Sequence, residues 1–226
     1  GHVRNAAWGD SLCRLMELSG YDVLREYYAN DAGNQIVKLG ESLGARYFEH
    51  FGRAAEDTLP EDGYHAEDVK NIADAIAAED GGKWLTADPD ERLRYFMQTG
   101  KTRELEKINR DLELYRVKIT SWMHETFFYE NDKKRINDCL ALMDSKGLLY
   151  EKDGALWFKS TDYGDEKDRV LRKSDGTLSY LTPDIANHVY KIERGYNKLV
   201  DLWGADHHSY VLRMTAALEA LGYPKG

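Results

Sequence analysis

DGTLSYLTPDIANHVYKIERGYNKLVDLWGADHHSY, residues 175–210, contains more chemically committed side chains than any other run of the chain. Its opening Asp-Gly-Thr is typical of a turn, because Asp bonds its own backbone two residues on and Gly accepts a positive φ. A short strand at residues 178–181 is predicted next. Pro183 suits the first position of a helix and Thr182 the N-cap, so we expect Asp184 in the first turn, where the helix dipole favours a carboxylate.

A helix over residues 185–193 is expected to follow and to end at Gly195. The apolar run at residues 199–203 predicts a second strand, which leads into the loop Gly-Ala-Asp-His-His at residues 204–208. Open α/β sheets bind ligands at the carboxyl ends of their strands. A tyrosine, two aspartates and two histidines converge on neighbouring strand ends here. We therefore expect a functional site, with ordinary turns carrying polar side chains as the alternative.

The composition is that of a globular protein. The chain has 226 residues, of which 42% are hydrophobic and 31% charged, enough for one large domain or two small ones. No run approaches the roughly 20 apolar residues of a membrane helix and no charged-then-apolar leader is present, so we expect a cytoplasmic protein with no membrane partner. The net charge of −9 argues against a surface that is basic throughout and binds nucleic acid, but permits local basic patches. Cys13 and Cys139 have no CxxC spacing and are predicted to be separate buried thiols.

The remaining patterns place a helical region within an α/β sheet. A first helix ends at Gly20, and a strand at residues 21–28 and a helix at residues 35–51 follow. The later periodicities predict helices at about residues 66–78, 88–99, 102–115 and 134–146, an alternating stretch at 117–126, and a hairpin of residues 148–150 and 155–158. The sequence thus predicts an α/β fold whose parallel sheet is formed by residues 1–51 and 174–226. Residues 52–173 form a largely helical insertion with a small β-hairpin.

Several motifs spread over the whole chain occur together in one order. They are Gly-His-Val-Arg at residues 1–4 with Gly-Asp at 9–10, Gly-Tyr-Asp-Val at 20–23, Glu-Tyr-Tyr-Ala-Asn-Asp-Ala-Gly-Asn-Gln at 26–35, Asp-Gly-Thr through Tyr-Leu-Thr-Pro-Asp at 175–184, and Trp-Gly-Ala-Asp-His-His at 203–208. In this order and spacing they resemble the catalytic domain of a bacterial arginyl-tRNA synthetase, a class I aminoacyl-tRNA synthetase. The resemblance implies a Rossmann-type fold and activation of L-arginine with ATP and Mg²⁺, followed by transfer to tRNA(Arg). It also implies a monomeric parent enzyme with no protein-bound metal.

The resemblance implies a catalytic histidine and an arginine pocket. Gly1 and His2 match the second half of a His-x-Gly-His signature that binds ATP, whose histidines stabilise the transition-state phosphate at a helix N-terminus. A leader left by cloning is the alternative for these two residues. Tyr180 and Asp184 match the tyrosine and aspartate of the arginine pocket, where a carboxylate accepts a planar guanidinium in two hydrogen bonds. The alternative is a core tyrosine and a helix-start charge.

Two further loops match parts of the family's ligand sites. Gly204, Asp206 and His207 match the loop that holds the ribose and adenine of ATP. Asp206 also stands where other branches carry a glutamine near the arginine, so either ligand is open to it. His207 and His208 either line the nucleotide or cap the next helix. A loop that lines the active-site floor and places the terminal adenosine of tRNA is matched by Asn30, Asp31, Gly33 and Gln35. For Gln35, local bonds at a helix start are the alternative.

The sequence departs from the family's pattern at both ends. The resemblance places the first strand, with the first signature histidine, before Gly1, and the closing KMSK-type loop after Gly226. Since the loss of one transition-state donor lowers a rate on the order of a hundredfold, we expect residues 1–226 to be inactive alone. Two alternatives remain open. One is another class I synthetase such as a cysteinyl type, which needs zinc-binding cysteines. The other is a non-catalytic tRNA-binding module derived from a synthetase.

Overall fold

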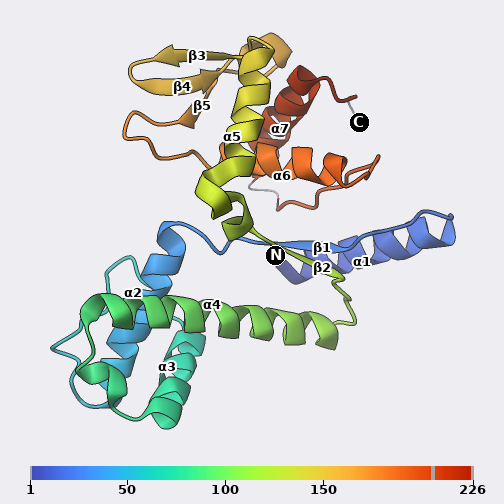
Figure 1. The fold of residues 1–226 in the computed structure, drawn as a ribbon. Helices are drawn as coiled ribbons and strands as arrows, with labels where there is room; N and C mark the ends of the chain where they lie inside the picture. The colour runs from blue at the N-terminus through green and yellow to red at the C-terminus, as the bar shows by residue number, and fades with distance from the viewer. Residues whose placement is uncertain (1, 205–206, 225–226) are drawn as a thin grey trace. The chain divides into compact units, whose positions relative to one another are not determined.

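The computed structural model describes residues 2–204 and 207–224, with only the backbone of His2. The chain divides into two compact units, a first unit of Gly1–Val23 with His124–Gly226 and a second unit of Leu24–Met123. In chain order, the elements (Figure 1) are α1 (His2–Leu18), β1 (Glu26–Ala29), α2 (Asn34–His50), α3 (Glu67–Asp80), η1 (Lys83–Leu85), α4 (Pro89–Leu114), β2 (Ser121–His124), η2 (Glu125–Tyr129), α5 (Glu130–Ser145), β3 (Leu149–Lys152), β4 (Ala155–Phe158), η3 (Ser160–Tyr163), β5 (Arg169–Arg172), α6 (Leu181–Glu193) and α7 (His208–Leu221).

These units differ from the predicted three-part division at residues 51 and 173. The predicted division states where an insertion interrupts a sheet. The two compact units do not test this point, so the predicted division stays a prediction. Among residues 2–204 and 207–224, no helix combines the length and the apolar character that crossing a bilayer requires.

Helices α2, α3 and α4 form the core of the second unit (Figure 1). Tyr47 of α2, Ile76 of α3 and Phe96 of α4 are each at most 1% exposed. These residues lie on the apolar stripes that the helical periodicity predicts, and burial of each such side chain stabilises the unit by about 1.5–3 kcal/mol. The predicted helices over residues 35–51 and 66–78 are confirmed within a few residues.

Helix α4 runs over Pro89–Leu114 without a break, whereas two helices were predicted there. Its start follows from the sequence: the Asp88 carboxylate accepts hydrogen bonds from two first-turn N–H groups at 3.0 and 3.1 Å, and a proline occupies the first turn. Gly100 lies inside the helix because α2 approaches it closely, and a Cβ there would lie 2.5 Å from Leu43 Cδ1. The predicted break was wrong because this glycine serves helix packing.

The second unit also contains the two-stranded sheet of β1 and β2. Residues in contact advance in step along both strands: Arg25 with Thr120, Glu26 with Ser121, and Tyr27 with Trp122. The two strands therefore run parallel, and α2, α3 and α4 supply the long crossover that parallel pairing requires. Strand β1 covers only part of the predicted strand at residues 21–28.

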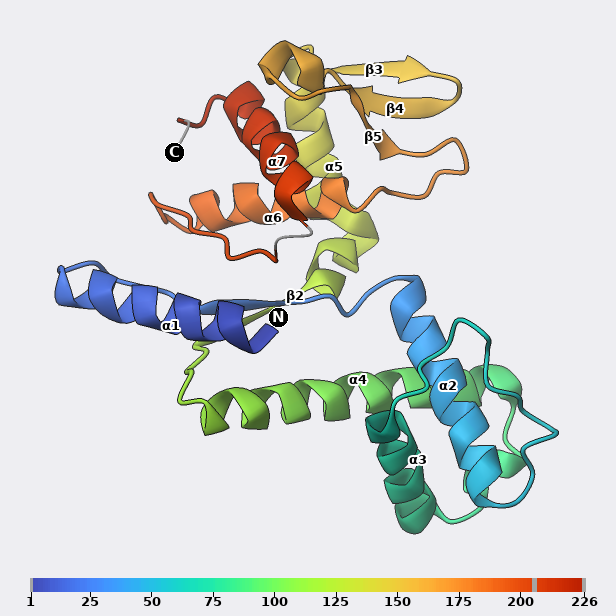
Figure 2. The ribbon, with the colours of Figure 1, turned by 180° about the vertical axis from the view of Figure 1, so that it is seen from behind.

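The first unit combines α5, α6 and α7 with the antiparallel sheet β3–β4–β5 (Figure 2). Asp153 and Gly154 turn the β3–β4 hairpin with φ values of 53° and 74°, as an Asp-Gly pair favours. The predicted hairpin is thereby confirmed. Strand β5 was missed, because Arg169–Arg172 reads from the sequence as a basic run.

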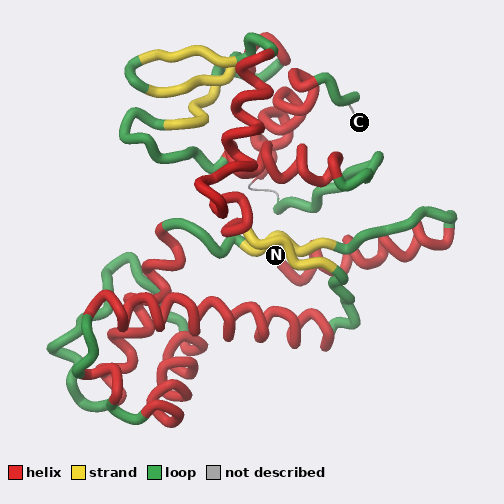
Figure 3. The backbone as a smooth tube through the Cα atoms, viewed as in Figure 1, coloured by secondary structure: helices red, strands yellow, loops and turns green. Residues whose placement is uncertain are grey.

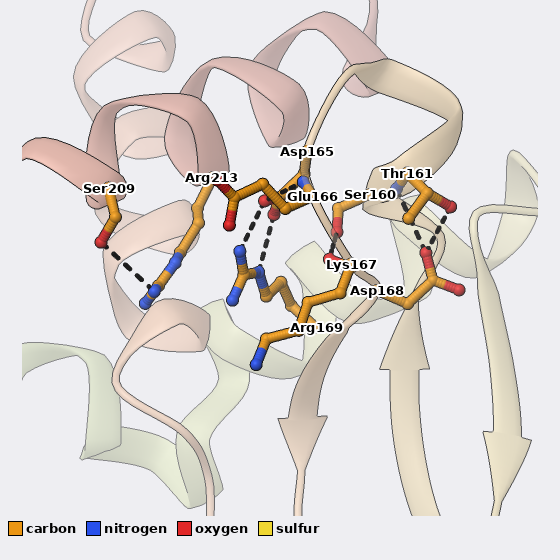
Figure 4. A network of polar contacts seen from close by, with 9 residues as sticks. All are labelled: Ser160, Thr161, Asp165, Glu166, Lys167, Asp168, Arg169, Ser209 and Arg213. Carbon is orange, nitrogen blue, oxygen red and sulfur yellow. Dashed lines mark hydrogen bonds and ion pairs between the residues drawn. The ribbon is translucent and has the colours of Figure 1, made fainter.

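A polar network fastens η3 to β5 (Figure 4). The Arg169 guanidinium donates two hydrogen bonds to the Asp165 carboxylate at 2.5 and 2.7 Å, and these side chains are 11% and 1% exposed. The hydrogen bond from Arg169 lowers the pKa of the Asp165 carboxyl against the opposing effect of burial. Ser160 donates to the Lys167 carbonyl at 2.8 Å. Asp165 is therefore a structural carboxylate that is paired with Arg169.

The strand predicted at residues 178–181 is wrong. A single bridge joins Leu178 to Arg172, and α6 begins at Leu181. Thr182 is not the N-cap, because it lies inside the helix and its hydroxyl donates to the Leu171 carbonyl of β5 at 2.6 Å. The Thr182 hydroxyl therefore bonds a neighbouring strand and does not cap α6, and the helix starts earlier than predicted.

The strand predicted at residues 199–203 is absent from the described residues as well. Figure 3 shows the described chain that follows α6, residues 194–204, as loop. Side-chain contacts with helices replace strand pairing here: Asp201 bonds His188 of α6, and Leu202 packs against Gly9 of α1, where a Cβ would lie 3.2 Å from Leu202 Cδ1.

Candidate functional site

Three tyrosines and two carboxylates come together in the first unit. Tyr210 of α7 donates a hydrogen bond to the Asp184 carboxylate of α6. Tyr129 of η2 donates to Glu125 at 3.3 Å and lies within electrostatic range of Asp184 and Tyr180. We call Glu125, Tyr129, Tyr180, Asp184 and Tyr210 the tyrosine–carboxylate cluster.

Burial controls the electrostatics of this cluster. It raises the pKa of the Asp184 carboxyl above its usual range, although the Tyr210 hydrogen bond and two nearby basic side chains act in the opposite direction. Burial, followed by the charge of Glu125, raises the pKa of Tyr129 to about 12. Burial and then the charge of Asp184 raise the pKa of Tyr210 as well. Tyr129 and Tyr210 therefore remain neutral donors, and carboxylate oxygens beside them are acceptors of the kind that suit a planar cation.

Glu125 and Asp184 are less exposed than Tyr180, the tyrosine that was predicted for the arginine pocket. Glu125 is 4% exposed, whereas Tyr180 is 68% exposed and precedes the first residue of α6. Asp184 lies in the first turn of α6, as predicted, where the helix dipole favours its charge. The core alternative for Tyr180 is therefore wrong, and its ring is available to cover a ligand.

A second group of contacts links the backbone of Asp184 to His188, Asp201 and Lys191. His188 Nδ1 lies 2.7 Å from the Asp184 carbonyl oxygen, and its Nε2 lies 2.8 Å from Asp201 Oδ2. Lys191 also donates to Asp201 at 3.2 Å. The side chain of His188 is 5% exposed and that of Asp201 is 26% exposed.

His207, which was predicted to bind the nucleotide, directly precedes α7 and lies beside the cluster. His207 donates its backbone N–H to the Gly204 carbonyl at 2.9 Å. The His207 ring meets the Tyr210 ring edge-on, with 6.4 Å between centroids. Within the described residues His207 makes no side-chain capping bond to α7, and His208 is exposed at the first position of the helix.

Some predicted residues cannot be placed in this way. Gly1 and Asp206 lie outside the described residues, and for His2 the structure gives only its position at the start of α1. The roles predicted for these three residues stay predictions.

The predicted floor residues belong to the second unit. Asp31 is 4% exposed and pairs with Lys101 of α4 at 3.3 Å. Gly33 precedes α2 with φ 77° and ψ −164°, a conformation that is nearly confined to glycine. Asn30 and Gln35 are exposed. Asp31 and Gly33 thus stabilise the conformation of this loop, whereas Asn30 and Gln35 present polar groups to solvent.

Sequence reasoning missed Glu125, Tyr129 and Tyr210 as site residues. Glu125 directly follows β2, so the rule that strand ends carry ligand groups would have found it. Tyr129 and Tyr210 carry no such signal, because their position depends on η2, α6 and α7 meeting in space.

Other features of the described surface lie apart from the cluster. A hollow of about 500 Å³ between α5 and the β3–β4–β5 sheet contains none of the predicted residues. Within the described ranges no group of three or more His, Cys, Asp or Glu side chains is arranged to hold a metal ion. In the part of the chain that the structure describes, neither Cys13 nor Cys139 forms a disulfide; Cys139 is buried and Cys13 is half-buried.

Comparison with known proteins gives consistent results over the whole chain. A family described as tRNA synthetases class I (R), catalytic domain, matches residues 1–226. An arginine–tRNA ligase from Bacillus subtilis is 52% identical over 226 residues, which is all of this chain and 40% of that protein. One from Halalkalibacterium halodurans is 52% identical over 225 residues, again 40% of its length. The chain thus spans about 40% of the length of these curated relatives.

Solved structures share the fold. A crystal structure assigned to an arginyl-tRNA synthetase from Campylobacter jejuni superposes with a TM-score of 0.90 at 37% identity, covering 99% of this chain and 48% of that one. A Thermus thermophilus arginyl-tRNA synthetase gives a TM-score of 0.64 at 21% identity, over 100% of this chain and 43% of that one.

Proposed function

The chain belongs to the class I arginyl-tRNA synthetase catalytic-domain family, and on this premise we propose that it carries the arginine-binding part of an arginine–tRNA ligase. The predicted α/β fold of that family is confirmed by the similarity to the Campylobacter jejuni structure. The family match and the named relatives favour the arginine type over the cysteinyl alternative.

The tyrosine–carboxylate cluster carries the proposal. A guanidinium presents planar N–H donors that match carboxylate oxygens, and it keeps its charge at all physiological pH values. Asp184 and Glu125 would accept these N–H groups, and the exposed ring of Tyr180 would lie over the side chain of arginine. On arrival of the ligand, the half-buried Asp184 charge gains the cationic partner that Tyr210, a neutral donor, does not supply.

We assign the other predicted residues to the parent reaction. L-Arginine and ATP form arginyl-adenylate and pyrophosphate, and the arginyl group then passes to tRNA(Arg) with release of AMP. His2 would act on the transition-state phosphate, and Gly1, His2, Gly204, Asp206 and His207 would bind ATP, which brings Mg²⁺ as part of the substrate and not as a metal held by the protein. Asp206 serves ATP or arginine, and the tRNA acceptor end would approach Asn30, Asp31, Gly33 and Gln35. We also propose a cytoplasmic, monomeric parent enzyme.

The first test is calorimetric titration of the 226-residue chain with L-arginine and with L-citrulline, which has the same shape without the guanidinium charge. Weak binding of arginine alone is expected if the cluster is preformed. Absence of arginine binding would contradict a preformed site in these 226 residues.

A second test addresses activity. We propose that residues 1–226 are inactive alone, and ATP–pyrophosphate exchange by the purified chain would contradict this. A chimera that replaces the matching region of the Bacillus subtilis ligase with residues 1–226 is expected to charge tRNA(Arg). The same chimera with Asp184→Asn is the matched control and is expected to lose that activity. Charging at equal rates by both chimeras would remove Asp184 from the proposed site.

A further inference from the structure

Residues 198–203, which we call the tether segment, touch three helices of the first unit. Lys198 lies over the Tyr21 ring, just beyond α1, at 5.7 Å. Leu202 packs against Gly9 of α1, Asp201 bonds α6, and the Trp203 ring meets the Tyr210 ring of α7 edge-on at 5.4 Å. Side-chain contacts therefore hold this loop in place.

The contacts around Asp201 close a ring that includes Asp184. Asp201 bonds His188, and His188 bonds the Asp184 carbonyl oxygen. In the other direction, Trp203 packs on Tyr210, whose hydroxyl bonds the Asp184 carboxylate. The tether segment thus contacts both residues that bond Asp184. Asp201 bonds His188, which bonds the Asp184 backbone, and Trp203 packs on Tyr210, which bonds the Asp184 carboxylate.

The hydrogen bonds of His188 link the backbone of Asp184 to the carboxylate of Asp201. The two partners of His188, a backbone carbonyl and a carboxylate, can only accept hydrogen bonds, so both ring nitrogens must carry a proton for both bonds to form. Burial acts to raise the pKa of the Asp201 carboxyl, but the hydrogen bond and charge of His188, with those of Lys191, outweigh it and hold the pKa well below its usual range. Asp201 is therefore a charged acceptor for the side chains of His188 and Lys191.

We propose that Asp201 is a positioning residue for the arginine site: by holding His188 and Lys191 it fixes the tether segment, and so keeps Tyr210 and Asp184 in register. This inference rests on the proposed function. A merely structural ion pair would stabilise the fold without affecting the ligand, and the first unit offers such a pair in Asp165 and Arg169.

The test compares Asp201→Asn and Asp201→Ala with the matched control Asp165→Asn in the 226-residue chain. Arginine affinity is measured by calorimetry, and hydrogen exchange is followed in peptides containing residues 198–203 and, as an internal reference, the β3–β4 hairpin. We expect Asp201→Ala to weaken arginine binding about tenfold, since a hydrogen bond to a charged group contributes this order of free energy. Asp201→Asn, which keeps the oxygen acceptor, is expected to restore part of the affinity. The tether segment, but not the hairpin, should exchange faster.

Asp165→Asn is expected to lower the melting temperature with arginine affinity unchanged. Equal exchange of the tether segment in the Asp201 variants and the unaltered chain would overturn the proposal. A loss of arginine affinity in Asp165→Asn as large as that in Asp201→Ala would overturn it too. If the unaltered chain binds no arginine, the proposed arginine site fails by that result. Exchange of the tether segment then decides separately whether Asp201 holds the loop.

Discussion

Asp184→Asn is expected to stabilise the chain at neutral pH while removing arginine binding. Asparagine has the shape of aspartate, and its oxygen still accepts the hydrogen bond of Tyr210. Burial raises the native pKa of Asp184, so the native state binds this proton more tightly than the unfolded chain does. The free energy of unfolding contributed by this group therefore falls as the pH rises through the ordinary aspartate pKa, and stays low above the raised native pKa. The substitution removes that penalty.

The effect on the ligand has the opposite sign and is large. Truncation of one partner of a buried, hydrogen-bonded charge pair weakens binding by about 2–5 kcal/mol, and the lower end corresponds to roughly 30-fold. Citrulline has no charge to lose, so its affinity should be nearly the same for both chains. The ratio of arginine to citrulline affinity isolates the charge contribution of Asp184.

Urea unfolding at pH 7 and at pH 3, with calorimetry at pH 7, measures both effects. The Asn variant should have the larger free energy of unfolding at pH 7, and the difference should vanish at pH 3, where Asp184 is protonated in both states. A variant that is less stable at pH 7 would refute the assignment of Asp184 as a desolvated carboxylate. Unchanged discrimination between arginine and citrulline would refute its role in binding.

Three further predictions concern packing, backbone strain and thiol chemistry. Asp132 has φ 54° in a left-handed turn, so Asp132→Gly should raise the free energy of unfolding by about 1 kcal/mol in urea titrations. Gly100→Ala places a Cβ 2.5 Å from a leucine methyl and should lower that free energy by about 1–3 kcal/mol. Gly82→Ala, whose Cβ would lie 3.4 Å from its nearest side chain, is the control and should show a much smaller loss. Burial raises the pKa of Cys139 to about 12, so iodoacetamide at pH 8 should alkylate half-buried Cys13 and leave Cys139 unmodified until the chain unfolds; modification of Cys139 in the native chain would contradict its burial.

The parts of the fold that the sequence predicted depend on local chemistry. Asp88 followed by proline starts α4, and Asp153 followed by Gly154 turns the hairpin, because each pair suits one backbone conformation. The apolar stripes of α2 and α3 likewise follow from helical periodicity. Such signals need no knowledge of distant residues.

The parts that were wrong or missed depend on distant partners. An apolar run such as residues 199–203 suits a strand and a packed loop equally, and the choice follows from His188 and Gly9, which the run meets only in the folded chain. Glu125 acquires its place in the site from α6, some sixty residues further along the chain. Gly100 is a helix breaker by propensity, and only its contact with α2 explains an unbroken helix.

Two aspartates of the first unit show how the carboxylate that we propose to bind arginine differs from a structural one. Asp165 is 1% exposed in its side chain and receives two hydrogen bonds from a guanidinium of its own chain, so its pKa is lowered despite burial. Asp184 is also withdrawn from water, but the hydroxyl that bonds it is neutral, and burial keeps its pKa raised. The pKa shifts of these two aspartates are thus opposite, and the sign follows from whether a cationic side chain is hydrogen-bonded to the carboxylate. Asp184 is the carboxylate whose charge is still to be compensated, and a free arginine brings the same guanidinium that Arg169 supplies to Asp165.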